Sequence, residues 1–402
     1  MRGETLMKEK ERETDLIQLC QELIRRPSLS GKERDIAHYI ADVMRFIGYD
    51  EVSIDSLGNV VGRIAFHAPG KRLLFESQMD HVDPGTLADW SFYPYGAFIK
   101  DGCIYGRGAS DQKGCLAAMV MAGAELKDKF YDTLKGELVV AGTVFQERFE
   151  GIASRSVAST FPPDYVVLGE ATDLKVKRGQ RGRAEIVIET QGRMAHSSNP
   201  ELGSNPADAM ISILSSIYQF FTPSFKPFFG ENVLVLTTLH TYPDLGTGLV
   251  PEICRAIFDL RISPDDSPES VIEKFGIFID QVKDSLHGIK VKIFVSETEE
   301  RTYTGAPIRG KHFASAWALS PDSEYLKKVL NAVMALDVES RLSDSPGFGT
   351  NGCYYAGELG IPTVAFGPSG EGQVHSVDEY IEINDLLRAF RGYEGIAREV
   401  LA

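Results

Sequence analysis

The spacing of apolar residues predicts helices alternating with strands over the first 170 positions. Helical spacing covers 15–25 and resumes after Ser30, where Glu33 completes the pattern of a capping box. Uninterrupted apolar runs predict strands, and a stretch rich in alanine and methionine predicts a further helix. Strands are predicted at 59–64, 72–79, 137–145 and 165–168, and the further helix at about 113–127. Such alternation is typical of a mostly parallel sheet covered by helices on both faces.

A different pattern follows Gly179. Its order is strand, helix, strand, strand, helix, strand, which is the split arrangement of a small open-faced sandwich. The edge strands of such a sheet are free to pair with another copy. The strands are predicted at 183–190, 232–240, 254–262 and 289–295, with one helix entered at Asn205-Pro206 and another at 268–284.

The first pattern resumes after a loop through 300–320, with a helix at 323–335, a strand at 362–366 and an amphipathic helix near the chain end. We therefore predict an α/β protein whose larger domain, residues 1–178 and 299–402, is interrupted by a smaller one. The inserted domain, residues 179–298, is predicted to be a βαββαβ, ferredoxin-like domain for covering a site or for dimerisation.

The composition excludes several classes of protein and of binding partner. The 402 residues are 43% hydrophobic, which suits a globular chain of about two domains, and the net charge of −15 argues against a nucleic-acid partner. Five scattered cysteines without CxxC pairing are typical of reduced thiols. The first residues show no apolar signal-peptide core, and no window approaches the ~18 apolar residues of a membrane span. We expect a soluble cytoplasmic protein.

Four of the five candidate metal ligands follow predicted strands, and the fifth, Asp111, precedes a predicted helix. A His-x-Asp pair alone is most often a solvated turn, and an aspartate before a helix is most often an N-cap. Together, however, two imidazoles and three carboxylates suit zinc, cobalt or manganese. The count fits two ions, with one shared carboxylate plus one histidine and one carboxylate each, and Asp83 has the chemistry to orient His81. The five candidate ligands are His81, Asp111, Glu147, Glu170 and His375.

Several stretches, in this order, resemble one enzyme family. They are "DHVDPG", "GRGASDQKG", "QERFEG", "LGEATD", "GRMAHSSNPELGSNPADA" and "FGPSGEGQVHSVDEY". They resemble the co-catalytic dizinc peptidase/deacylase family of aminoacylase, glutamate carboxypeptidase, acetylornithine deacetylase and succinyl-diaminopimelate desuccinylase. The stretches "GRGASDQKG", "RGQRGR" and "GFGTNG" most resemble the branch of selenium-metabolism-linked hydrolases. The resemblance implies a zinc-peptidase-like fold and a small-molecule substrate.

The resemblance also implies a role for each candidate ligand. Asp111 would bridge two metal ions. His81 and Glu170 would complete one metal site, and Glu147 and His375 would complete the other.

Two residues of the inserted domain match further functional positions of the family. His196 would stabilise the oxyanion in the partner subunit of a homodimer, although a capping or core histidine is the ordinary interpretation. Arg261 would hold a substrate carboxylate, against the equal alternative of an exposed arginine at a strand end.

The chain also departs from the family pattern. Gln146 occupies the position of the general base, and an amide cannot take a proton from water. Asn351, which the resemblance places at the substrate, stands where many relatives carry aspartate. Gln146 is an introduced change, or a natural mark of a weak or binding-only member, or the register is shifted and Glu147 or Glu150 is the base.

The leading hypothesis is a metallohydrolase that cleaves the amide C–N bond of a small N-acyl amino acid or dipeptide, using water activated by two metal ions. The alternatives are a catalytically silent protein that binds metal and ligand in the same fold, and a purely structural dimer.

Overall fold

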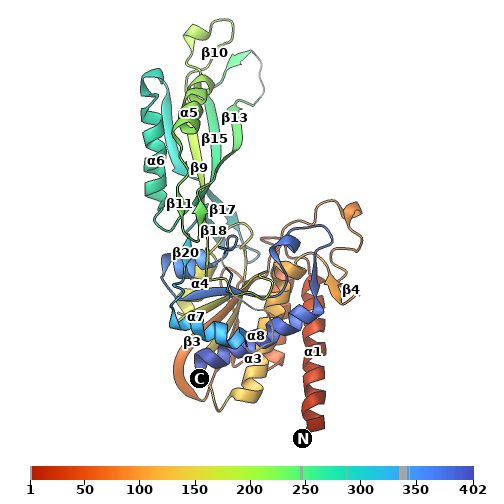
Figure 1. Cartoon of the computed structure of the whole chain (residues 1–402). Helices are drawn as coiled ribbons and strands as arrows, with labels where there is room; N and C mark the ends of the chain where they lie inside the picture. Colours follow the sequence, from red (N-terminus) through yellow and green to blue (C-terminus); the bar gives the residue numbers. More distant parts are fainter. Residues whose placement is uncertain (1, 245–247, 287, 335–341, 344) are drawn as a thin grey trace. The chain divides into compact units, whose positions relative to one another are not determined.

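The computed structural model describes residues 2–244, 248–286, 288–334, 342–343 and 345–402 (Figure 1). It divides into two compact units. Unit 1 contains the chain up to Gln180, Glu299–Arg309 and Ala318–Ala402, and unit 2 contains Arg181–Thr298 and Gly310–Trp317. The strip at 310–317, which we placed in the larger domain, therefore belongs to unit 2.

The centre of unit 1 is a six-stranded sheet whose main part is parallel, as predicted. The parallel strands β6, β3, β7 and β21 are neighbours, and β2 and β1 extend the sheet antiparallel beyond β6. The strands are β1 (Glu51–Ile54), β2 (Val60–Ala65), β3 (Ala68–Gln78), β6 (Lys135–Thr143), β7 (Tyr165–Gly169) and β21 (Thr363–Phe366). Strand β1 was not predicted, because its four residues carry no buried side chain and so leave no apolar signal.

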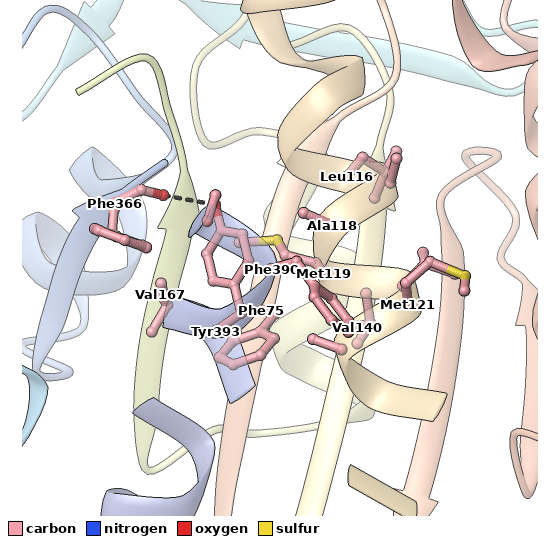
Figure 2. Close-up of a cluster of buried hydrophobic side chains, with 14 of the residues drawn as sticks. Phe75, Leu116, Ala118, Met119, Met121, Val140, Val167, Phe366, Phe390 and Tyr393 are labelled. Atoms are coloured by element: carbon pink, nitrogen blue, oxygen red, sulfur yellow. Dashed lines mark hydrogen bonds between the residues drawn. The ribbon is translucent and has the colours of Figure 1, made fainter. Parts of the chain in front are cut away.

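Helices α3 and α8 pack against each other and against β3 and β6. Figure 2 shows the resulting core, where Phe75 of β3, Met119 of α3 and Tyr393 of α8 meet. The Tyr393 hydroxyl donates a hydrogen bond of 2.7 Å to the carbonyl of Phe366, at the end of β21. The helices of unit 1 are α1 (Arg2–Ile24), α2 (Arg34–Phe46), α3 (Gly114–Phe130), α4 (Ser154–Thr160), α7 (Glu324–Met334) and α8 (Ile383–Leu401). Within the described ranges, none of the helices combines the length and apolar character that a bilayer-spanning segment needs.

The capping box predicted at the start of α2 does not form. Glu33 is the N-cap residue but makes no side-chain capping bond, and its Oε1 accepts from the amides of Gly31 and Phe145, at 2.9 and 3.2 Å. The Ser30 hydroxyl donates to Asp80 Oδ2 at 2.7 Å. Both side chains therefore have partners at the ends of β3 and β6, and not only at the start of the helix.

A small antiparallel sheet in unit 1 was also not predicted. Strand β5 (Cys103–Tyr105) pairs with β4 (Phe98–Lys100) on one side and with β22 (Tyr380–Glu382) on the other. Three-residue strands are too short to show a period. This sheet brings the segment before Asp111 next to the segment after His375.

Unit 2 has the predicted βαββαβ order. Its antiparallel sheet runs β13-β15-β9-β16, so β13 is an edge strand. Buried Phe258 of β15 packs among residues of both helices on one face, while the other face carries ion pairs such as Arg255–Glu189. Asn205 caps the first helix and Ser267 forms a capping box at the second. The elements are β9 (Gly182–Gln191), α5 (Pro206–Phe220), β13 (Leu234–Tyr242), β15 (Ile253–Ile262), α6 (Pro268–Asp280) and β16 (Lys290–Val295).

Short strands complete the chain. They are β8 (Gly179–Gln180), β10 (Ala195–His196), β11 (Phe225–Lys226), β12 (Gly230–Glu231), β14 (Leu249–Val250), β17 (Glu297–Arg301), β18 (Pro307–Lys311), β19 (Phe313–Ala314) and β20 (Trp317–Ala318).

Candidate metal centre and active site

Three of the predicted ligands converge in unit 1. His375 Nε2 lies 3.0 Å from Asp111 Oδ2 and 3.3 Å from Glu147 Oε2. One ligand atom from each residue lies within 4.8 Å of the other two, and no other such histidine, cysteine or acidic group occurs in the described part of the chain. An imidazole with two carboxylates is a donor set that suits a divalent ion such as zinc.

A buried ion pair positions Asp111. Glu379 Oε2 accepts from Arg107 Nη1 at 2.6 Å, and neither side chain is more than 3% exposed. Glu379 Oε1 accepts from the backbone amides of Ser110 and Asp111, at 2.8 and 3.1 Å. Arg107 also donates to the carbonyl of His375, at 3.5 Å. The pair thus connects the segments that carry two of the three ligands.

A second buried carboxylate holds the turn after β6. Asp80 Oδ1 accepts from the amide of Gln146 at 3.1 Å, and Oδ2 accepts from that of Glu147 at 3.2 Å. The turn is entered through Phe145, whose φ is +60°, and His375 has the same left-handed φ. Such backbone conformations are uncommon for residues other than glycine and occur often at functional sites.

The electrostatics of the cluster favour a bound cation. Burial, with a smaller contribution from Asp111, raises the pKa of the Glu147 carboxyl. Burial raises the pKa of Glu170 well above its usual range, and the charges of Asp111 and Glu147 raise it further. Hydrogen bonds to Asp111 and Glu147 raise the pKa of His375 to about 10. These shifts show that the acidic oxygens stabilise positive charge at the half-exposed His375, where a divalent ion would take the place of the imidazole proton, so these residues fit such an ion.

His81 does not belong to this cluster, and the expectation that it is a metal ligand is corrected. Its Nε2 accepts from the amide of Ser28 at 2.9 Å, which leaves Nδ1 to donate to the carbonyl of Val82 at 2.8 Å. Both ring nitrogens are therefore used by backbone groups. Asp83 is exposed and accepts from the amide of Gly85, at 2.8 Å, so it does not orient the imidazole.

The side chains that approach the cluster from β3 are Gln78 and Asp80 instead. Gln78 is the last residue of β3, is buried, and donates from Nε2 to Asp111 Oδ1 at 2.7 Å. Neither residue was predicted from the sequence. Their spacing of two, which points side chains to the same side of an extended chain, was the signal that could have identified them.

Glu170 follows β7 and is buried, as its predicted role requires. Its Oε2 accepts a short hydrogen bond from Gln112 Nε2. The Gln112 Oε1 atom accepts from the Cys115 thiol at 3.3 Å, which fixes the orientation of the amide.

Gln146 is buried beside Glu147, and its Nε2 donates to the carbonyl of Gly349 at 3.5 Å. Glu150, the alternative base, lies against the same glycine, since a Cβ at position 349 would come within 2.1 Å of Glu150 Oε1. The role of Gln146 at the base position, and of Glu150 as the alternative base, stays a prediction.

Asn351 is a structural residue in this protein, which corrects its assignment to the substrate. Its Oδ1 accepts from the amide of Gly151 at 2.7 Å. Its Nδ2 donates to Glu76 Oε1 at 2.8 Å and to Thr143 Oγ1 at 3.2 Å. Its polar atoms thus have partners inside unit 1. Burial raises the pKa of Glu76, a residue of β3, to about 7.

A cavity of about 460 Å³ lies in unit 1, but it is not the metal centre. Its wall includes Ala171, Lys177 and Ser369, and none of the three clustered ligands lines it. We therefore assign it no part in the chemistry.

The two functional residues predicted in unit 2 are accessible there. His196 is exposed, and its Nδ1 accepts from the amide of Ser198 at 3.1 Å. Arg261, whose side chain is 40% exposed, pairs with Asp259 at 3.3 Å. Their roles toward substrate stay predictions.

Comparison with known proteins places this site in a family. The model of Peptidase family M20/M25/M40 matches residues 74–399, which include every clustered ligand. The chain belongs to this family.

The M20 relatives match nearly the whole chain. It is 29% identical to the uncharacterized protein YgeY of Escherichia coli strain K12 over 400 residues, 99% of this chain and 97% of that protein. It is 24% identical to succinyl-diaminopimelate desuccinylase 2 of Ruegeria sp. strain TM1040, over 95% of this chain and 96% of that one. A solved structure with the same fold is the Bacillus subtilis YXEP protein, described as a dinuclear metal binding peptidase. It has a TM-score of 0.70, 15% identity, and coverage of 98% of this chain and 99% of that one.

We predict that the Glu379→Gln substitution lowers the free energy of unfolding by about 3–5 kcal/mol, because it leaves the Arg107 charge buried without its partner. The matched control is Glu358→Gln, which removes one partner of the exposed Arg155–Glu358 pair and is expected to cost less than about 0.5 kcal/mol. Urea denaturation measures both values. Equal effects would contradict the positioning role of Glu379.

We also predict that Glu76 makes stability depend on pH. Its folded-state pKa of about 7 lies above the ordinary 4.5, so folding favours the protonated form. The resulting stabilisation is complete below pH 4.5 and is lost as the pH rises through 7. Between pH 5 and pH 8, the native protein should therefore lose more unfolding free energy than the Glu76→Gln variant. Parallel stability curves from denaturant titrations would show that Glu76 does not titrate in this range.

Proposed function

We propose that this protein is a metal-dependent hydrolase that cleaves the amide C–N bond of a small N-acyl amino acid or dipeptide. The convergence of Asp111, Glu147 and His375, with buried Glu170 nearby, carries the proposal. Zinc fits the donor set best, and cobalt and manganese are the alternatives. The desuccinylase and the peptidase among the similar proteins support an amide substrate of modest size.

Three residues of the site would bind the cation, and two others position the turns that carry them. Asp111, Glu147 and His375 would hold the cation, which when bound supplies Lewis acidity to the amide carbonyl and to the attacking water. Glu379 and Asp80 keep the two ligand-bearing turns in place through backbone amides. This preorganisation lets the ligands meet the ion without a large rearrangement.

Position 146 limits turnover. The Gln146 amide can donate a hydrogen bond to water or accept one, but it cannot take up a proton at neutral pH. The neighbouring carboxylate of Asp80 already accepts from two amides and from Ser30, so it is not available as a base. We therefore propose weak hydrolytic activity for the chain as it stands.

The same observation supports a second candidate function. A protein that keeps the ligand cluster and carries an amide at the base position could bind metal and a small ligand without turnover. The activity of a variant with the carboxylate restored separates the two candidates.

We further propose that unit 2 forms a homodimer through the edge strand β13. In the described part of the chain no strand pairs with the outer edge of β13, which exposes Val235, Leu239 and Tyr242. The neighbouring sequence element α5 exposes Ile211 and Tyr218. An exposed apolar edge strand is a ready surface for pairing with a second copy.

We predict that Gln146→Glu raises kcat by about 10²–10⁴-fold on a responsive substrate, because general-base catalysis contributes rate factors of this size. Mass spectrometry of a panel of N-acyl amino acids and dipeptides, with Zn²⁺, Co²⁺ or Mn²⁺, measures hydrolysis. The control is Gln373→Glu, which adds a carboxylate two residues before His375 without occupying the base position. Equal turnover by the native protein and the Gln146→Glu variant would contradict the assignment of position 146.

We predict that Leu239→Lys on β13 shifts the protein from dimer to monomer, because a charge on the pairing strand opposes burial of the edge. The control is Leu359→Lys in unit 1, where leucine is 48% exposed, close to the 51% of Leu239. Light scattering coupled to size-exclusion chromatography measures the mass. A native monomer would remove the basis for a partner-subunit role of His196.

A further inference from the structure

The two sides of Asp111 differ in their partners. Oδ2 faces His375 Nε2 at 3.0 Å, and Glu147 completes that side with oxygens 3.3 Å from the same nitrogen. Oδ1 instead accepts from the Gln78 amide at 2.7 Å. One side thus presents a histidine and carboxylates, while the other is closed by an N–H donor.

Glu170, the carboxylate expected to bind the second ion, also accepts a hydrogen bond from a side-chain amide. Glu170 Oε2 accepts from Gln112 Nε2. The Gln112 amide cannot easily turn its oxygen inward, because that oxygen accepts from the buried Cys115 thiol. One oxygen of Asp111 and one oxygen of Glu170 are therefore both hydrogen-bonded to side-chain amides.

Among the residues that the structure describes, no imidazole is available on this side. His81, the residue expected there, uses both ring nitrogens for the backbone of Ser28 and Val82. The amide nitrogen of Gln78 is a donor and not a metal ligand. If the amide turned its oxygen toward an ion, it would lose the bond to Asp111 and offer a carbonyl, which suits magnesium, calcium or manganese better than zinc.

We infer that this chain binds one zinc-type ion, at Asp111, Glu147 and His375, and that Gln78 closes the position of a second. The inference rests on the proposed metal-dependent function and changes the number of metal ions expected per chain. Two ions were expected from the count of ligands, but the residues present fit one ion and not two. Gln78 acts here by occupying Asp111 Oδ1 and by supplying no imidazole.

The test measures metal content without reference to activity. The full-length protein, stripped with chelator and then dialysed against Zn²⁺, is analysed by mass spectrometry for bound metal, and titration calorimetry with Zn²⁺ counts the binding events. The expected result is one zinc per chain for the native protein. The Gln78→His variant is expected to bind two, because it removes the donor to Asp111 and adds an imidazole at the end of β3.

The control variant is Gln78→Met, which removes the donor while keeping a side chain of similar length and adding no imidazole. It is expected to stay at one zinc per chain. Circular dichroism and thermal unfolding verify that each variant is folded, and the native stoichiometry stands as a test if a variant is not.

The outcomes separate the inference from the proposed function. Two zinc ions bound by the native protein would overturn the inference and leave the metal-dependent function in place. No zinc would overturn both. A folded Gln78→His variant that binds only one zinc would show that Gln78 does not close the second position, and a second zinc in Gln78→Met would show that an imidazole is not required there.

Discussion

The site of this protein depends on the buried ion pair between Arg107 and Glu379. The two residues are 272 positions apart, and the pair lies beside the pairing of β5 with β22. Glu379 also accepts from the amides of Ser110 and Asp111, and Arg107 reaches the carbonyl of His375. Removing one partner of a buried charge pair leaves the other charge uncompensated, so the pair holds these two ligand-bearing segments together.

The parallel sheet supplies the rest of the geometry. Strands β3, β6 and β7 end at the same edge, and the residues that follow or end them include Gln78, Glu147 and Glu170. This edge is where open α/β sheets collect their sites. The acids there have two different tasks: Asp80 binds backbone amides and holds a turn, while Glu147 faces His375. Asp80 is fully buried and Glu147 only partly, so both their burial and their partners distinguish them.

Amides occupy several positions around the cluster where charged or basic groups would assist metal chemistry. Gln146 cannot serve as a base, Gln78 covers one oxygen of Asp111, and Gln112 covers one of Glu170. Membership of the M20 family gives this chain its fold and the frame of a metallohydrolase. Individual residues on that frame decide its chemistry, and these three amides are the basis of our proposals for weak turnover and for a single metal ion.

The sequence by itself determined the alternation of helices and strands, the inserted βαββαβ unit, and the set Asp111, Glu147 and His375 that the structure brings together. The spacing of apolar residues along the chain reflects which side chains are buried, and burial of one face stabilises these helices and strands. Only the tertiary structure decided that Gln78 and not His81 faces Asp111, and that Asn351 binds Glu76. A buried polar side chain takes the partners that distant segments bring to it. The residues next to it in the sequence do not indicate which partners these will be.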